Sequence, residues 1–376
     1  MDWSRALHIL KCIFRIIFVF INNLYCIPTY VMWTLVLLRP LRHFKPAIYW
    51  KIEGILFKWL LYMVAAWNWS AKYYIQEVGE DISSCVNHRS LILMNHQSTA
   101  DVPLLMAAFQ NKGEVLQNVT WVMDHLFRYT NFGVVSWIHG DFFIAQGKSG
   151  REVQLEKLRS HLVKVYLQQD RQWIILFPEG GFLRKRLESS QKYKRAWLSC
   201  SQSCYVPRIG ALKVILNVLK KENVGNGIII DHLNNEQVSV KKPEPLKWVI
   251  DITVGYPDGG RPLSLPTICT GSRPPCVTYM HYRKFPIDDI PSNNEEELRN
   301  WLFKRWQEKE EMLTEFYKTG KFPVSHLGES SDCGHESFQP VQQLNCVLWL
   351  CLNVFFIIST YFHCYLLIKL WQLMFW

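Results

Sequence analysis

The stretch LILMNHQSTAD, residues 91–101, places a histidine and an aspartate five positions apart, directly after an apolar run. The run is typical of a buried strand that ends just before His96. Pro103 suits the first turn of a helix, which puts Asp101 near the amino end, where the helix dipole favours a carboxylate. A turn between strand and helix can then bring Asp101 to one ring nitrogen of His96. Such a pair is a general base with its orienting group.

The same residue types also have other uses in proteins. A capped loop, with His96 in a turn and Asp101 opening a helix, needs no chemistry at all. A serine hydrolase needs a GxSxG nucleophile elbow, which the chain lacks. The GKSG at 147–150 is similar to the end of a P-loop, but Phe142 stands where that motif needs its first glycine. A His–Asp pair without its own nucleophile indicates a base that acts directly on a substrate hydroxyl.

A second candidate lies in WIILFPEGG, residues 173–181, where an apolar strand is followed by Pro178, Glu179 and two glycines. This turn offers backbone N–H groups and room for a substrate, with Glu179 directed inward. The residues that follow include Arg184, Lys185 and Arg186, a basic run suited to phosphate. A solvated turn at a helix start would explain the same residues.

The elements that must position these groups have the pattern of an α/β domain between Lys72 and Gly320. Two helices are predicted, over 151–167 and over 293–320, the second opening with Asn and acidic residues and ending at glycine. Residues 222–247 and 258–276 are polar or rich in Pro and Gly and are predicted to be loops. Strands are predicted for the short apolar runs SLILM, VTWVM, WIILF, WVIDITV and VTYMHY.

Composition narrows the class of protein. The 376 residues are 49% hydrophobic and 14% aromatic, with 16 Trp, so apolar surface remains available for lipid. The net charge of +10 suits an anionic partner, but no nucleic-acid-binding motif or basic low-complexity tail is present. The eleven cysteines form no CxxC pair, and Cys200 with Cys204 is a poor zinc site. We expect reduced thiols, no metal and no nucleic acid.

Both ends of the chain have the composition of membrane segments. No charged side chain occurs from Ser337 to Ile368, and residues 346–367 form a 22-residue apolar core, close to the ~20 needed to span a bilayer. Ile16 to Leu38 is also uncharged, but Asn22, Asn23 and Pro28 interrupt it, so a kinked or re-entrant pair of helices is expected. A cleaved signal peptide is not expected. Tryptophans 59, 67 and 69 fit interfacial anchors or core packing equally well.

Four short motifs occur in order along the middle of the chain. They are NHxxxxD at 95–101, GDFFI at 140–144, FPEG at 177–180 and YVPRIGA at 205–211. Together they resemble the motifs of the membrane glycerophospholipid acyltransferases. The resemblance extends over nearly the whole chain and implies an α/β fold, a mixed sheet flanked by helices, with membrane-embedded helices at both termini.

The resemblance also implies roles for residues. His96 would be the general base on a free glycerol hydroxyl and Asp101 its orienting group, with direct attack on acyl-CoA and no acyl-enzyme. Acyl-CoA is then a co-substrate, and no cofactor is expected. The residues expected to shape the acceptor and acyl-CoA sites are Asn95, Gly140, Phe143, Glu179, Gly180, Gly181, Arg184, Lys185, Arg186, Pro207 and Arg208.

Two departures from the family pattern bear on the acceptor. The family's common Arg at the end of the second motif is Gln146 here, and FPEGTR becomes FPEGGF, with Phe182 in place of Arg. Both changes favour a diester lysolipid, such as lysophosphatidylglycerol or lysophosphatidylethanolamine, over lysophosphatidic acid. Monoacylglycerol acylation is an alternative within enzymes, and an idle lipid-binding or scaffold protein is an alternative outside them.

The sequence therefore predicts four regions and a location. They are an N-terminal membrane-associated helical region (1–69), an acyltransferase domain (70–320), a linker (321–343) and a C-terminal transmembrane segment (344–376). The expected location is the endoplasmic reticulum membrane with the catalytic domain in the cytosol. Asn68 and Asn118 stand in glycosylation sequons, and neither is expected to carry a glycan.

Overall fold

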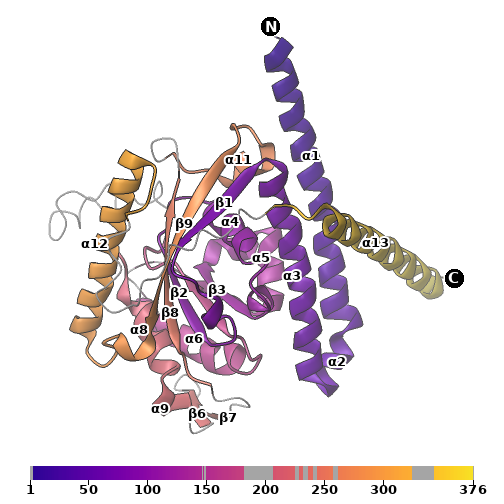
Figure 1. Ribbon diagram of the computed structural model, residues 1–376. Coiled ribbons are helices and arrows are strands. Elements are labelled where there is room, and N and C mark those ends of the chain that lie inside the picture. The colour runs from indigo at the N-terminus through magenta and orange to yellow at the C-terminus, as the bar shows by residue number, and fades with distance from the viewer. Residues whose placement is uncertain are drawn as a thin grey trace.

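A seven-stranded sheet forms the centre of the computed structural model, which describes residues 3–145, 147, 150–181, 206–224, 228–231, 236–239, 244–256, 261–323 and 343–375 (Figure 1). Its strand order is β1-β9-β8-β2-β5-β3-β4, and a separate hairpin joins β6 to β7. The strands are β1 (Tyr73–Gly79), β2 (Ser90–Met94), β3 (Val119–Asp124), β4 (Phe142–Ile144), β5 (Trp173–Leu176), β6 (Ile228–Asp231), β7 (Glu236–Ser239), β8 (Trp248–Gly255) and β9 (Cys276–Pro286).

The directions of the strands determine which strand ends, and therefore which side chains, lie together at one edge of the sheet. The strands β8, β2, β5, β3 and β4 are parallel to one another, whereas β9 is antiparallel to β8 and β1 is parallel to β9. The five parallel strands therefore end at one edge of the sheet, as is usual for ligand sites in α/β folds. His96, Glu179 and Tyr256 follow three of these ends. We call this the carboxyl edge.

Helices cover both faces of the sheet, which is the three-layer arrangement expected of a buried parallel sheet. Alternate residues of β2 serve the two cores: Ile92 faces one, and Leu91 and Leu93 face the other. In Figure 1, α12 lies on one side of the sheet and α3 with α1 on the other. The first core includes α1, α3, α4 and α5, and the second includes α6, α8 and α12.

The helices have the following bounds. The larger ones are α1 (Trp3–Val31, continued in π-helical geometry over Met32–Leu37), α3 (Pro46–Ser70), α4 (Asp101–Ala108), α5 (Asn131–His139), α6 (Arg151–His161, continued over Leu162–Tyr166), α8 (Ile209–Val218), α12 (Glu295–Thr319) and α13 (Cys346–Phe375). The short ones are α2 (Arg39–Phe44), α9 (Lys221–Val224), α11 (Leu265–Thr270) and single turns at Ser83–Cys85, Val115–Gln117, His125–Tyr129 (η4) and Ile287–Asp289.

The predicted mixed sheet with flanking helices is confirmed. All five predicted strands are present, and the helix over 293–320 begins at the Asn294 cap and ends at Gly320 with φ 76°. Strands β1, β4, β6 and β7 were not predicted. The loop predictions were wrong in part, because β6 and β7 fall within 222–247 and α11 within 258–276. Their short lengths and polar neighbours conceal them from a search for apolar runs. Most of the predicted linker and the Cys200–Cys204 pair lie outside the described residues.

The expectation of a re-entrant pair of helices divided at Asn22, Asn23 and Pro28 was wrong. One helix runs through these residues, and the chain turns back only at α2, from which α3 returns beside α1. Asn22 is buried and accepts a hydrogen bond from the Trp67 indole at 3.2 Å. Trp67 and Trp69 are themselves buried, so the core alternative holds for both. The polar residue Asn22 in the apolar helix α1 therefore makes a contact with α3 and does not interrupt α1.

Among the residues that the structure describes, two helices are long and apolar enough to cross a membrane, Trp3–Leu37 and Cys346–Phe375. They pack on each other through polar groups: Tyr25 donates to Asn353, Thr29 and Thr360 are 2.9 Å apart, and the Trp33 and His363 rings meet edge to face. Buried polar contacts of this kind join helices in lipid, where apolar surface alone gives little preference between partners.

A buried charge cluster ties α3 to the sheet. Glu53 of α3 accepts from Arg171 at 2.9 Å, contacts the Nδ1 of His139 at 2.8 Å, and accepts from the Tyr30 hydroxyl at 2.5 Å. The Phe57 ring stacks on His139 with centroids 3.5 Å apart. Since all these side chains are almost fully buried, each charge depends on its partner. The helix α3 is therefore fixed to the domain that carries the carboxyl edge.

Glu53→Gln should strongly destabilise the protein, because it leaves Arg171 buried without its carboxylate. Loss of one partner of a buried pair typically costs about 3–5 kcal/mol. Thermal unfolding in detergent would measure the effect, with Glu152→Gln in α6, an exposed glutamate, as the matched control. Equal melting temperatures for the two variants would contradict this account of the cluster.

Candidate active site

His96 and Asp101 meet at the carboxyl edge, where β2 passes into α4. The Nδ1 of His96 is 2.8 Å from Oδ2 of Asp101. The same oxygen accepts the Ser98 N–H at 2.9 Å. Asp101 is the first residue of α4, so its carboxylate also lies in the favourable field of the helix amino end. The Asp101 side chain is fully buried, whereas that of His96 is 14% exposed.

Tyr256 completes the surroundings of Asp101. It follows β8, and its hydroxyl donates to Oδ1 of Asp101 at 2.5 Å. Burial raises the pKa of Tyr256 well above 10, so the hydroxyl keeps its proton and remains a donor. Tyr256 was not among the residues predicted for the site. The available signal was its position directly after the predicted strand WVIDITV, at the end of what proves to be a parallel strand.

The arrangement can remove a proton from a hydroxyl group. Because Asp101 holds Nδ1, the tautomer with its proton on Nδ1 is stabilised, and Nε2 is the ring nitrogen that can accept a proton. The Phe177 ring lies beside the imidazole, with centroids 4.4 Å apart. A buried carboxylate that stabilises an imidazolium, together with an apolar wall, is the form of a general base.

Glu179 lies next to this pair as a buried carboxyl group. Its Oε1 accepts the backbone N–H of His96 at 3.4 Å and the Trp306 indole N–H at 3.0 Å. Burial raises the pKa of Glu179 to about 8, and the Asp101 charge nearby acts in the same direction. At neutral pH the group is therefore mainly a neutral acid. It connects the turn after β5 to the turn after β2.

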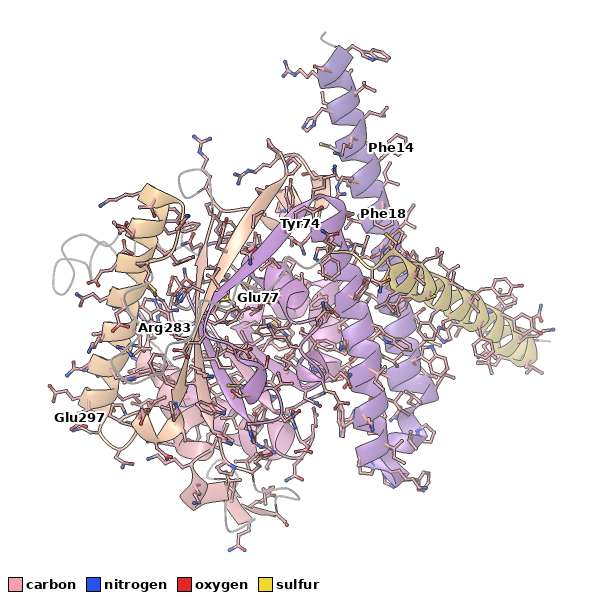
Figure 2. The ribbon with its side chains drawn as sticks, in the orientation of Figure 1. Phe14, Phe18, Tyr74, Glu77, Arg283 and Glu297 are labelled. Atoms are coloured by element: carbon pink, nitrogen blue, oxygen red, sulfur yellow. The ribbon has the colours of Figure 1, made fainter. Side chains whose placement is uncertain are left out.

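Helix α12 brings Trp306 to Glu179, and buried charges fix that helix to the sheet. Lys309 of α12 is 2.7 Å from Asp251 of β8, and Arg283 of β9 pairs with the same carboxylate at 2.6 Å. Arg283 also reaches Glu308 of α12, and Figure 2 shows its side chain between β9 and α12. In the sequence, Trp306 is one apolar position of a predicted helix, and nothing near it in the chain indicates a role at the site.

Other predicted residues lie in the segments around the pair and make hydrogen bonds to or from backbone groups there. Asn95 is buried, and its side-chain amide bonds to both the N–H and the carbonyl of Val254, which joins β2 to β8. Gly180 adopts φ 72° in the turn after β5, with Gly181 next in the chain. The Arg208 N–H donates to the Pro178 carbonyl at 2.8 Å, so the fourth motif adjoins the third. Pro207 is buried and Arg208 exposed.

The second motif lies farther from the pair. Phe143 is in β4, the edge strand, and three places from β2 in the sheet order. Gly140 precedes β4 with φ 95°, and its carbonyl accepts from His161 at 2.9 Å. The structure therefore does not bring Gly140 to His96. The predicted residues Arg184, Lys185 and Arg186, and the departures Gln146 and Phe182, lie outside the described residues.

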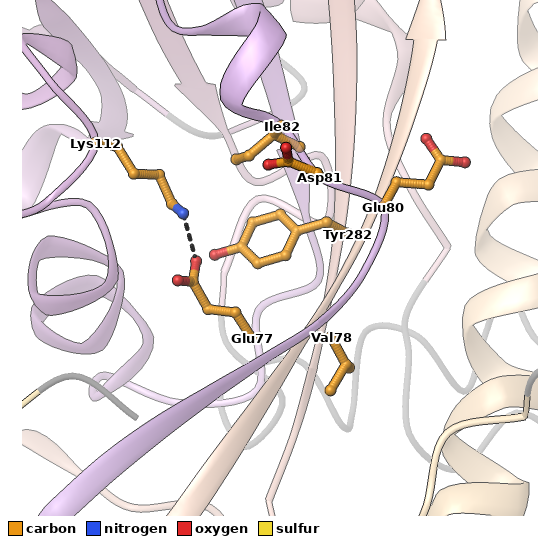
Figure 3. A pocket seen from close by; sticks show the side chains of 7 residues that line it. All are labelled: Glu77, Val78, Glu80, Asp81, Ile82, Lys112 and Tyr282. Carbon is orange, nitrogen blue, oxygen red and sulfur yellow. Dashed lines mark ion pairs between the residues drawn. The ribbon is translucent and has the colours of Figure 1, made fainter. Parts of the chain in front are cut away.

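A small polar pocket beside β1 is separate from this site. Glu77 pairs there with Lys112 at 2.9 Å, next to the buried Tyr282 ring (Figure 3). Its strand is three places from β2 in the sheet order. Neither His96 nor Asp101 lines this pocket, so it is not the centre of the proposed chemistry.

Comparison with known families gives two matches. The family described as Acyltransferase matches residues 72–219, which include β2, the His96–Asp101 turn and Glu179. The family described as Acyltransferase C-terminus matches residues 271–356, which include β9 and α12. The two matched segments thus contain the two sides of the Glu179–Trp306 contact.

Similar proteins match over most of the chain. The human protein named acyl-CoA:lysophosphatidylglycerol acyltransferase 1 is 42% identical, over 95% of this chain and 96% of its own length. A putative 1-acyl-sn-glycerol-3-phosphate acyltransferase of Caenorhabditis elegans is 30% identical, over 81% and 76%. The crystal structure of the 1-acyl-sn-glycerophosphate acyltransferase of Thermotoga maritima has a TM-score of 0.40 and 15% identity, over 80% of this chain and 98% of that chain.

His96→Ala should abolish acyl transfer and leave the fold intact, because the imidazole is at the surface of the site. Loss of a general base typically costs a factor on the order of 10²–10⁴. Asp101→Asn should also be severe. Tyr256→Phe should lower kcat by about 10-fold with KM unchanged, since one hydrogen bond to a charged group is lost. Steady-state kinetics and melting curves would test this. Near-normal turnover in purified His96→Ala would refute the assignment.

Glu179→Gln should remove a pH dependence of stability. The folded protein holds the Glu179 pKa near 8, above its ordinary value of 4.5, so its contribution is fully present below pH 4.5 and is lost as pH rises through 8. Gln keeps the acceptor oxygen and cannot ionise. From pH 6 to 9 the wild-type melting temperature should fall more than that of Glu179→Gln. Parallel curves would show that Glu179 does not titrate in this range.

Proposed function

The chain belongs to the acyltransferase family, and from that premise we propose that it transfers a fatty acyl group from acyl-CoA to the free glycerol hydroxyl of a lysophospholipid. The observation that carries the chemistry is the 2.8 Å contact between His96 and Asp101. The name of the human relative, 42% identical over 95% of the chain, supports lysophosphatidylglycerol as the first acceptor to test. Acyl-CoA serves as co-substrate, and no metal or prosthetic group is invoked.

The proposed reaction proceeds by direct attack. Nε2 of His96 takes the proton of the acceptor hydroxyl as its oxygen bonds to the thioester carbonyl carbon, and Asp101 stabilises the resulting imidazolium. The tetrahedral intermediate then breaks its C–S bond. The CoA thiolate leaves and receives the proton from the imidazolium, which yields free CoA and the acylated phospholipid. Tyr256 and Ser98 hold Asp101 in place throughout.

The acceptor's phosphate gives a second basis for the proposal. A phosphate monoester carries nearly two negative charges at neutral pH, as phosphorylated side chains do, whereas a diester carries one. The family's Arg after FPEG is Phe182 here, so one partner for the second charge is absent. Arg184, Lys185 and Arg186 remain for a singly charged diester. This favours lysophosphatidylglycerol or lysophosphatidylethanolamine over lysophosphatidic acid.

Phe182→Arg should shift acceptor preference towards the monoester, because charge-assisted pairs with phosphate are the strong ones. In an assay with lysophosphatidylglycerol and lysophosphatidic acid present together, wild type should acylate the diester faster. The ratio of the diester rate to the monoester rate should be lower for the variant than for wild type. Phe182→Leu is the matched control. A wild-type preference for lysophosphatidic acid, or a ratio that ignores the charge at 182, would overturn this account.

The protein is membrane-associated, and we propose the endoplasmic reticulum with the catalytic domain in the cytosol, where acyl-CoA is available. The structure bears on one of the two sequons, since Asn68 is fully buried and donates to the Pro103 carbonyl at 3.1 Å. A folded chain cannot present this side chain to a transferase. Asn118 is partly exposed and is the informative position.

Asn118 should carry no glycan in the native protein, because the domain that contains it faces the cytosol. Glycosidase treatment and mass spectrometry of protein from native membranes would test this. A new sequon placed in an exposed lumenal segment would confirm that the expression host glycosylates the protein. A glycan on Asn118 would reverse the proposed orientation.

A further inference from the structure

An exposed apolar surface begins in η4, beside the edge of the sheet where His96 lies, and continues along α5. The structure describes most of residues 72–323, and seven large apolar side chains are strongly exposed within that range. Five of them fall within twelve residues, in η4 and α5, and we call these five the apolar shelf. They are Leu126 (54% exposed), Phe127 (47%), Tyr129 (82%), Val134 (42%) and Trp137 (55%).

The strand register places the shelf beside the site. In β3, Val122 is level with Leu176 of β5, and Leu176 is level with Leu93 of β2. The residue that follows β3 is therefore at about the level of His96, two strands away. The segment between, after β5, carries Phe177 and Glu179, which contact His96. Phe177 forms the apolar wall beside His96, and the η4 end of the shelf lies next to it in the order of the strands.

The shelf has a built shape. The Thr130 hydroxyl accepts the Gly133 N–H at 3.0 Å and caps α5, while the Thr130 N–H donates to the Phe127 carbonyl. A Cβ on Gly133 would lie 2.1 Å from that carbonyl oxygen, so only glycine allows η4 to fold so closely onto α5. The backbone that carries these exposed aromatic side chains therefore has a defined, closely packed conformation.

Composition and neighbours indicate what covers the shelf. Residues 125–139 contain no acidic side chain and include an exposed arginine, Arg128, together with Tyr and Trp. Aromatic rings and cationic groups of this kind occupy the boundary between lipid and water. Helix α5 packs against α1, whose outer side exposes Phe20 and Leu24. The shelf therefore adjoins a helix that is long and apolar enough for a membrane.

The same edge also carries the projecting end of α1. Arg15 donates to the carbonyl of Ile268 in α11, which lies beyond the end of β8. The residues before Arg15 extend past the domain and expose Phe14 and other apolar side chains (Figures 1 and 2). Two separate apolar features thus point to lipid on the side of the sheet where His96 lies.

We propose that the apolar shelf rests in the interface of the bilayer and holds the carboxyl edge against the membrane. A lipid acceptor could then reach His96 from the bilayer without crossing water. The placement of the shelf stands on exposure and register alone, whereas the route for the acceptor rests on the proposed function. The two parts need separate readouts.

The contact itself is tested by photocrosslinking. Benzoylphenylalanine would replace Phe127 or, as a control, Arg299, an exposed residue near the start of α12 at the opposite edge of the sheet. The full chain would be reconstituted in phosphatidylcholine vesicles with some phosphatidylglycerol. Lipid adducts should form at position 127 at a yield about tenfold above that at 299. Equal yields, or adducts at 127 only to a second copy of the chain, would overturn the proposal.

The acceptor route is tested by kinetics. Phe127→Ser with Tyr129→Ser should raise KM for long-chain lysophosphatidylglycerol in vesicles by about tenfold. The kcat and KM for a short-chain, water-soluble acceptor should not change, which excludes a folding defect. Equal effects on both acceptors would refute the route. If wild type acylates neither acceptor, the proposed function fails, while the crosslinking result still decides whether the shelf meets lipid.

Discussion

The buried carboxylate of Asp101 is the constraint on which the site depends. A charge that is removed from water needs donors, and Asp101 obtains three of them from two segments. The turn between β2 and α4 supplies the imidazole of His96 and the Ser98 N–H, and the residue after β8 supplies the Tyr256 hydroxyl. These donors meet only if β2, the turn before α4 and the end of β8 are in register. The same contacts that satisfy the charge therefore also orient the base. A fold that lost the register would lose the chemistry with it.

The part of the chain after residue 270 completes this arrangement from the outside. Burial of Lys309, Asp251 and Arg283 is tolerable because each is paired, and the pairing fixes the rotation of α12 against the sheet. That rotation directs Trp306 at Glu179, whose other partner is the His96 backbone. The helix contributes no base or nucleophile to the proposed chemistry, yet through Glu179 it supports the turn that contains His96.

The amino-terminal helices are joined to the domain by the same physical means. Glu53, His139 and Arg171 are buried together between α3 and the sheet, while α1 and α13 meet through Tyr25, Asn353 and other polar groups. Polar side chains in long apolar helices thus serve as contacts with specific partners. They hold the apolar surfaces of α1, the apolar shelf and the carboxyl edge in one fixed relation.

Local sequence patterns were sufficient to predict five of the nine strands that the structure describes and the candidate His96–Asp101 pair. Apolar runs predicted five strands, and the spacing of His96, Asp101 and Pro103 predicted a strand, a turn and a helix start, because these features depend on neighbours in the chain. The residues that support this pair from elsewhere in the chain are visible only in the folded structure. Tyr256 contacts Asp101 from 155 residues away, and Trp306 contacts the neighbouring Glu179 from 127 residues away. Strand order and register, which local periodicity does not encode, bring them there. The same reason explains why Asn22 read as an interruption: its partner, Trp67, is visible only once α3 has folded back onto α1.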